Sequence, residues 1–165
     1  MEDSVKSLMN SQVISVLPST PILMTIDIII NNNFNGIPVT DKEGRLAGII
    51  TKYDLIAKRN YIRDDMTTGD VMNKEPLVLE ENMTINDAIR AFTEHHRVDP
   101  IPVIDADKKV IGIISRYDMV RLFREYGSSF IDKSPSAKGR RNVLGFFLVL
   151  AIVISALLVY YLFFF

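Results

Sequence analysis

An internal repeat limits the folds that this chain can adopt. When the sequence is shifted by 64 residues, segment 37–56 falls on segment 101–120, and nine of the 20 paired residues are identical. We predict that this register runs back without a gap to Thr20 over Thr84, and that one gap extends the match to the start of each copy. Similarity that keeps one offset over this length predicts two copies of one supersecondary unit that share a core.

Each copy predicts the element order β-α-β-β-α, and therefore an α+β fold. The expected strands cover residues 13–17, 37–40 and 46–50 in the first copy and residues 77–79, 101–104 and 110–114 in the second. The first helix begins at a cap signal, which is Ser19-Thr20-Pro21 in one copy and Thr84 in the other. The last helix of each copy is expected to begin after Thr51 or Ser115.

The last 23 residues, 143–165, carry no charged side chain. As a helix they would be about 35 Å long, enough to cross a hydrocarbon core of about 30 Å. A buried soluble helix is the alternative, but such a helix needs a polar face, which this segment lacks. Basic residues precede the segment, and the positive-inside rule keeps that side cytoplasmic. We expect a single-pass, tail-anchored membrane protein whose N-terminal body is cytoplasmic.

These patterns divide the chain into five segments. They are a first repeat over 1–58, an inter-repeat linker over 59–70, a second repeat over 71–125, a basic flexible linker over 126–142 and a transmembrane helix over 143–165. The formal net charge of −1 gives no field that would attract nucleic acid. The sequence shows no nucleophile–base pair, no metal-spaced ligand set and no glycine-rich phosphate loop, so we expect neither an enzyme nor a catalytic cofactor.

Two motifs recur in both copies. Ile-Pro-Val with a following Asp occurs at 37–41 and 101–105, and Gly-Ile-Ile-Thr/Ser-Lys/Arg-Tyr-Asp occurs at 48–54 and 112–118. In these motifs the chain resembles CBS repeats over residues 5–124. The resemblance implies a pair of repeats with pseudo-twofold symmetry and two clefts, which in the family often hold AMP, ADP, ATP or S-adenosylmethionine. It also implies a homodimer of such pairs.

The strand-to-helix corners are the first candidate binding groups. Each offers a hydroxyl, a cation and a carboxylate, namely Thr51, Lys52 and Asp54 in the first copy and Ser115, Arg116 and Asp118 in the second. The carboxylate can accept both hydrogen bonds of a ribose diol, and the helix N-terminus and the cation can attract phosphate. A capping box is the alternative explanation for the Thr/Ser and Asp pairs, and both roles can hold at once.

Further candidates each have a structural alternative. The resemblance implies that backbone groups near Ile37-Pro38 and Ile101-Pro102 read an adenine edge, but the same residues fit the start of an edge strand. Thr20 and Thr84 are candidate phosphate contacts, and they also fit simple helix caps. Their side chains therefore leave both interpretations open.

The end of the second copy's first helix is the last candidate. His96 and Arg97 fit a phosphate clamp, or cations stabilised by the helix dipole. The aligned residues 32 and 33 are asparagines, so we expect the site with His96 and Arg97 to bind more tightly. Met24 aligns with Ala88, which predicts a bulkier packing residue and a less open cleft in the first copy.

Together these features predict a membrane-anchored regulatory module. It would bind an adenosyl ligand and signal to a partner, for which a membrane protein is one candidate. A ligand-independent membrane adaptor is the alternative.

Overall fold

The computed structural model describes the backbone of residues 4–132 and the side chains of residues 4–124. Its elements are α1 (Val5–Leu8), α2 (Ile22–Asn31), β1 (Gly36–Thr40), β2 (Leu46–Thr51), α3 (Lys52–Ala57), α4 (Thr68–Val71), β3 (Leu79–Glu80), α5 (Ile85–Glu94), β4 (Ile101–Ile104), β5 (Val110–Ile114) and α6 (Arg116–Asp132). The predicted transmembrane helix over 143–165 lies outside the described residues. Within the described part, no helix is both long and apolar enough to cross a bilayer.

Each repeat forms a small sheet around an antiparallel hairpin. β1 pairs with β2, and β4 pairs with β5, and these strands lie where the sequence predicts strands. In repeat 2 the hairpin is joined in parallel by β3. In repeat 1 the strand predicted over 13–17 is reduced to one bridge, Val16 to Val39. The tips of the hairpins also bond to each other, with Leu46 N donating to the Lys108 carbonyl at 2.9 Å.

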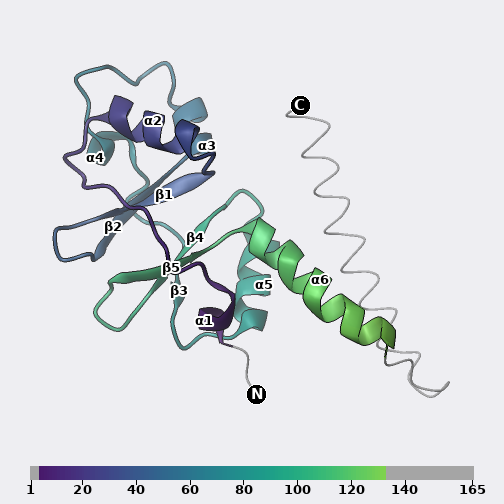
Figure 1. Ribbon diagram of the computed structural model, residues 1–165. Coiled ribbons are helices and arrows are strands. Elements are labelled where there is room, and N and C mark those ends of the chain that lie inside the picture. The colour runs from purple at the N-terminus through teal and green to yellow at the C-terminus, as the bar shows by residue number, and fades with distance from the viewer. Residues whose placement is uncertain (1–3, 133–165) are drawn as a thin grey trace. The chain divides into compact units, whose positions relative to one another are not determined.

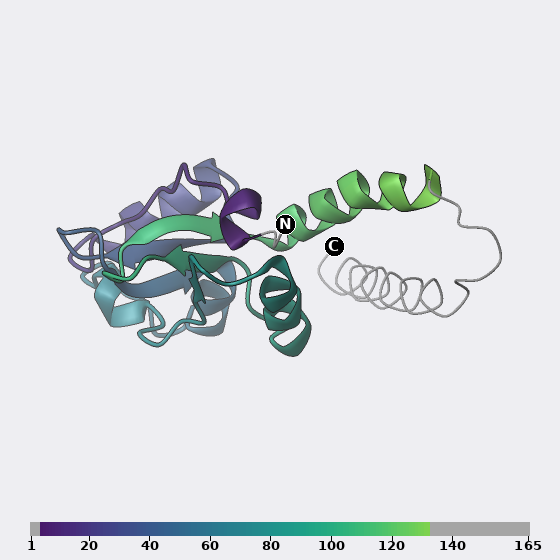
Figure 2. The same ribbon diagram turned by 90° about the horizontal axis from the view of Figure 1, so that it is seen from below.

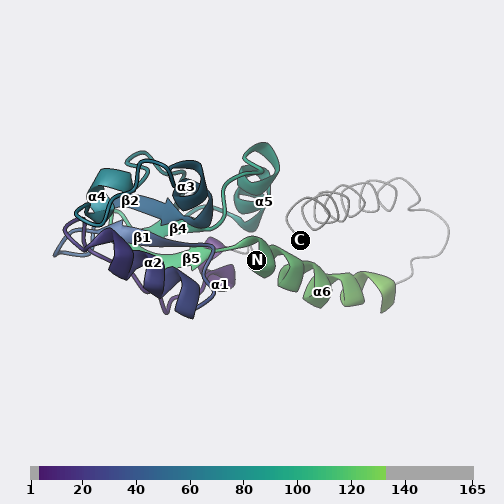
Figure 3. The ribbon, with the colours of Figure 1, turned by 90° about the horizontal axis from the view of Figure 1, so that it is seen from above.

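The short helices α1 and α4 each pack on the other repeat: α1 begins repeat 1 but packs on repeat 2, and α4 precedes the strands of repeat 2 but packs on repeat 1. Val5 and Leu8 of α1 are buried in the core of repeat 2, whereas Val71 of α4 is buried in the core of repeat 1. Figure 1 shows α1 beside α5 and α4 beside α2. In the view from above, α4, α2 and α3 gather at the β1–β2 end and α1 and α5 at the other (Figure 3). The repeats therefore complete each other's cores by exchange.

The chain that follows each short helix continues the exchange along the backbone. Asn10 forms two hydrogen bonds with Ile113 of β5, at 2.9 and 3.0 Å. Asn73 forms the equivalent pair with Ile49 of β2, at 2.9 and 2.8 Å. Figure 2 shows the N-terminal segment running along the strands of repeat 2. Each hairpin thus gains an edge partner from the other repeat.

Two glycines leave room for this crossing. A Cβ atom on Gly48 would lie 2.6 Å from the carbonyl oxygen of Asn73, closer than real Cβ contacts. A Cβ atom on Gly112 would collide with the side chain of Met9. These glycines belong to the repeated motif, so the exchange explains why the motif needs a residue without a side chain at both positions.

The first helices of the repeats align at an offset of 63 residues, because α2 starts at Ile22 and α5 starts at Ile85. The paired prolines of the hairpins, Pro38 and Pro102, remain 64 residues apart. One additional residue therefore lies in the loop over 95–100 relative to the loop before β1. The prediction that the register runs back without a gap to Thr20 over Thr84 is therefore wrong. The sequence does not reveal the additional residue, because it lies in a loop and leaves the pattern of both helices intact.

This shift corrects two expectations about the first helix. Pro21, and not Thr20, occupies the N-cap of α2, while Thr84 caps α5 in a capping box with Asp87. The Thr20 hydroxyl instead accepts a hydrogen bond from Leu17 N at 3.2 Å. Met24 is 57% exposed and fills no packing position. The expectation that it narrows a cleft is therefore wrong.

Two predicted linkers contain helix. α4 begins at Thr68, inside the segment 59–70, where Thr67 and Asp70 form a capping box. The Thr67 hydrogen bonds hold the pKa of Asp70 below its usual value. α6 continues to Asp132, inside the segment 126–142, since no proline interrupts it before residue 135.

A buried hydroxyl pair joins α4 to α2. Thr25 and Thr68 are fully buried, and their Oγ1 atoms lie 2.6 Å apart. The Thr68 hydroxyl also donates to the Thr20 carbonyl at 3.0 Å, so Thr25 donates to Thr68. At the offset of 63, the equivalent residues of repeat 2 are Ala88 and Val5, which are apolar and buried in one cluster.

This substitution pattern gives a stability prediction. We expect Thr68→Val to lower the free energy of unfolding by about 1–3 kcal/mol, because the buried Thr25 hydroxyl loses its acceptor. Adding Thr25→Ala reproduces the apolar pair of repeat 2 and should recover most of the loss. Denaturant unfolding measures both changes. A stable single variant, or a double variant less stable than the single one, would contradict this account.

Candidate functional site

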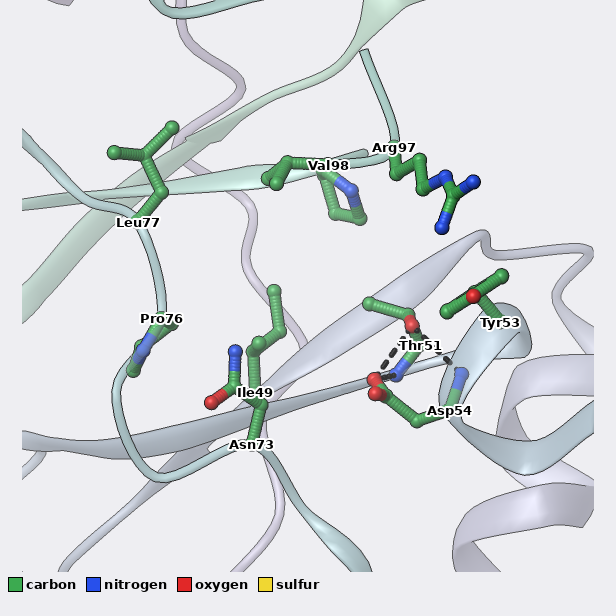
Figure 4. A pocket seen from close by; sticks show the side chains of 10 residues that line it. Ile49, Thr51, Tyr53, Asp54, Asn73, Pro76, Leu77, Arg97 and Val98 are labelled. Atoms are coloured by element: carbon green, nitrogen blue, oxygen red, sulfur yellow. Dashed lines mark hydrogen bonds between the residues drawn. The ribbon is translucent and has the colours of Figure 1, made fainter. Parts of the chain in front are cut away.

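A cavity of about 220 Å³ opens at the strand-to-helix corner of repeat 1. Ten residues line it: Ile49, Thr51, Tyr53, Asp54, Asn73, Pro76, Leu77, Arg97, Val98 and Pro100. They come from the corner between β2 and α3, from the exchanged chain after α4, and from the loop before β4 (Figure 4). The cavity is smaller than the roughly 300–1,000 Å³ of typical small-molecule sites, so a ligand would extend beyond it.

The floor of the cavity holds the predicted capping box. Thr51 donates to Asp54 Oδ2 from its backbone N at 2.9 Å and from its hydroxyl at 2.6 Å. The Asp54 backbone N donates back to the Thr51 hydroxyl at 3.1 Å. Among the described residues, none donates a hydrogen bond to the second carboxylate oxygen, Oδ1. The capping role therefore leaves one oxygen of Asp54 available to a ligand.

Arg97 stands on the opposite side of the cavity. Figure 4 shows its guanidinium directed toward Tyr53 and Thr51 across the open space. No described carboxylate forms an ion pair with it. Apolar side chains, including Val98 and Leu77, line the cavity beside these polar groups (Figure 4). The arrangement offers a slot for a flat apolar ring, a carboxylate for a diol and a cation for an anionic group.

The equivalent corner of repeat 2 differs in its carboxylate. Ser115 caps α6 in the same way, donating to Asp118 Oδ2 from its backbone N at 2.8 Å and from its hydroxyl at 2.7 Å. Asp118 is only 7% exposed. Its Oδ1 atom lies 3.4 Å from Arg121 Nη2. Both oxygens of Asp118 therefore have partners within the chain.

Lys52 and Arg116 interact with the first helix of their own repeat. Lys52 Nζ donates to Asn33 Oδ1 at 3.1 Å, just beyond the C-terminus of α2. Arg116 Nη2 donates to the His95 carbonyl at 3.3 Å at the end of α5, and its guanidinium lies 5.5 Å from the Phe92 ring centroid. Cations are favoured at helix C-termini by the helix dipole.

The loops after α2 and α5 are tied together by Asp99. Its Oδ2 atom accepts from Asn35 Nδ2 at 2.8 Å, and its Oδ1 atom accepts from the Arg116 backbone N at 3.0 Å. Burial raises the pKa of Asp99 above its usual value, although both hydrogen bonds oppose this shift. Asp99 is two residues from Arg97 in the same loop. Its hydrogen bonds to Asn35 of repeat 1 and Arg116 of repeat 2 therefore link the position of this loop to both repeats.

Comparison with known proteins gives the family. The model of the CBS domain matches residues 5–60 and again residues 69–125, which is more than half of the chain. The chain belongs to the CBS domain family. It contains a tandem CBS pair.

Relatives of this CBS pair include the chloroplastic CBS domain-containing protein CBSX1 of Arabidopsis thaliana, which is 27% identical over 135 residues, with 64% of this chain and 57% of CBSX1 covered. The crystal structure of CBSX2 in complex with AMP is 28% identical, with a TM-score of 0.67, and covers 76% of this chain and 98% of that one. The CBS domain pair of protein MJ0100, in complex with 5′-methylthioadenosine and S-adenosylmethionine, is 25% identical, with a TM-score of 0.65, and covers 73% and 98%. The chain therefore spans about half the length of CBSX1.

The CBS pair brings three of the predicted ligand residues together. Thr51, Asp54 and Arg97 line the cavity of repeat 1. Ile37, Pro38, Ile101 and Pro102 are buried in β1 and β4, outside the lining. His96 is exposed and outside the lining, and Thr20 and Thr84 lie at the starts of α2 and α5.

Several lining residues have no role in the sequence interpretation. They are Ile49, Tyr53, Asn73, Pro76, Leu77, Val98 and Pro100. Ile49 and Tyr53 belong to the repeated motif, so their recurrence is a signal. Asn73 to Leu77 reach the cavity only because the chain after α4 crosses to repeat 1, which no local pattern in the sequence reveals.

Proposed function

We propose that this CBS pair binds an adenosine-containing ligand in the cavity of repeat 1 and that binding regulates a partner protein. The observation that supports it most is the Oδ1 atom of Asp54, which accepts no hydrogen bond from the described residues and belongs to a cavity with apolar walls and with Arg97 on the opposite side. A ribose diol would donate to Asp54, and the adenine ring would pack between Val98 and Leu77. The complexes of CBSX2 with AMP and of MJ0100 with S-adenosylmethionine support this class of ligand.

Regulation requires that the ligand favours one conformation of the pair over another. The cavity walls come from both repeats, since Asp54 belongs to repeat 1 and Arg97 belongs to repeat 2. A ligand that contacts both residues would draw the Arg97 loop toward α3. The Asp99 hydrogen bonds to Asn35 and Arg116 would transmit that movement to the contact between the repeats.

Thermal unfolding of the full chain in detergent tests the proposal. AMP, ADP, ATP, S-adenosylmethionine and 5′-methylthioadenosine are added separately, with guanosine monophosphate as the control nucleotide. A ligand that binds only the folded state stabilises it by about 2.7 kcal/mol at a hundredfold excess over its Kd. We expect at least one adenosine compound to raise the melting temperature. No shift with any of them would favour the alternative function, a ligand-independent adaptor.

We propose further that residues 143–165 anchor the CBS pair in a membrane, with its body in the cytoplasm. The absence of charge from this segment and the basic residues before it support the proposal. Deletion of 143–165 should move the protein from the membrane fraction to the supernatant after carbonate extraction. Retention of the truncated protein in the membrane fraction would contradict the anchor.

We also propose that two CBS pairs associate as a homodimer. α3 and α6 expose apolar side chains at equivalent positions: Tyr53 and Ile56 on α3, and Tyr117 and Val120 on α6. Exposed apolar side chains that recur on equivalent helices support a symmetric contact surface. Sedimentation equilibrium in detergent would report the number of chains in each particle.

A further inference from the structure

Each corner of the CBS pair uses a cation to hold the exchanged helix. In repeat 1, Lys58 Nζ donates to the Val71 carbonyl at the end of α4. In repeat 2, Arg121 Nη2 donates to the Leu8 carbonyl at the end of α1, at 3.3 Å. Both contacts place a positive charge at a helix C-terminus, where unpaired carbonyl groups accept it. The two corners are equivalent in this respect.

Arg121 makes a second contact that Lys58 does not make. The same Nη2 atom lies 3.4 Å from Asp118 Oδ1, three residues earlier on α6. The position equivalent to Arg121 in repeat 1 is Ala57, whose side chain has no group that can pair with Asp54. Both carboxylates complete a capping box, but only Asp118 also forms an ion pair among the described residues.

We propose that Arg121 closes the corner of repeat 2, so that each chain binds one adenosine ligand, at Asp54. This inference rests on the proposed function. A ribose diol at Asp118 would have to displace a guanidinium from a carboxylate that is already buried. A diol would form its own hydrogen bonds to this carboxylate only at the cost of the attraction between the carboxylate and the opposite charge of Arg121. At Asp54 the diol displaces no charged group.

Isothermal titration of the full chain with AMP tests the assignment, and a second titration uses S-adenosylmethionine. We expect one molecule of ligand per chain in the wild type. Arg121→Gln keeps an amide that can donate to the Leu8 carbonyl but removes the charge, and it should raise the stoichiometry to two. Ala57→Arg creates the same pair with Asp54 and should weaken binding at least tenfold.

Lys58→Gln is the matched control, because it removes the equivalent cation without touching either carboxylate, and it should keep one site. Circular dichroism confirms that each variant is folded. Two sites in the wild type, one site in a folded Arg121→Gln variant, or unchanged affinity in Ala57→Arg would each overturn the inference. Absence of binding by both ligands would instead overturn the proposed function, and the inference with it.

Discussion

Replacing Asp54 with alanine is expected to weaken AMP binding by about a hundredfold or more. The diol of a bound ribose would donate two hydrogen bonds to this carboxylate, and a hydrogen bond to a charged group contributes about 1.5–3 kcal/mol. Two such bonds correspond to about 3–6 kcal/mol, or a factor of roughly 10² to 10⁴ in Kd. Isothermal titration of the purified full chain in detergent measures the change.

The capping role of Asp54 calls for a control, because the alanine variant also loses the hydrogen bonds from Thr51. Asp118→Ala provides it, since this variant loses the equivalent hydrogen bonds from Ser115. Each variant keeps its N-cap residue, Thr51 or Ser115, and loses the N3 half of the capping box, so we expect the two losses of stability to be similar. Only the Asp54 variant should lose binding. Equal loss of binding in both variants would show that the caps, and not the free oxygen of Asp54, account for the effect.

Leu8→Ala is expected to destabilise the protein by about 2–5 kcal/mol, the usual range for truncating a buried leucine. Leu8 is 4% exposed and packs in the core of repeat 2, although it lies at the start of repeat 1 in the sequence. Since whole domains are stable by only about 5–15 kcal/mol, the loss is a large fraction of the total. Denaturant unfolding gives its size.

Hydrogen exchange shows where the Leu8→Ala effect falls. We expect amide protection to decrease first in α5 and β5, because these elements surround Leu8. Lys6→Ala is the control on the same helix, since Lys6 is exposed and forms only a surface ion pair with Glu81. Such pairs contribute about 0–1 kcal/mol. Protection lost first in β1 and β2 would contradict the exchange of α1.

The sequence predicts most of the fold because the repeat is local and regular. The hairpins, the capping box at Thr84 and the starts of α3 and α6 all lie where the motifs place them. Of the site, Thr51, Asp54 and Arg97 are predictable, since a hydroxyl, a carboxylate and a cation each have recognisable chemistry. These features depend on neighbours within a few residues.

The remaining features depend on packing between distant segments. The match between residues 8–10 and 71–73 is visible in the sequence, but which repeat these residues pack on is not. The additional residue in loop 95–100 is not visible in the sequence, because the apolar pattern of each helix is unbroken on either side of the loop. The ion pair between Arg121 and Asp118 requires the course of α6 and the position of α1.

The exchange of α1 and α4 makes the two repeats indivisible. A fragment that ended after α3 would keep α1, which has no place in its own core, and would lack α4. A protease cut between residues 59 and 67 of the whole protein leaves both helices present. The two pieces would stay associated, because α1 of the first piece packs in the core of repeat 2 and α4 of the second piece packs in the core of repeat 1. The cavity, with Asp54 on one piece and Arg97 on the other, would survive the break in the chain.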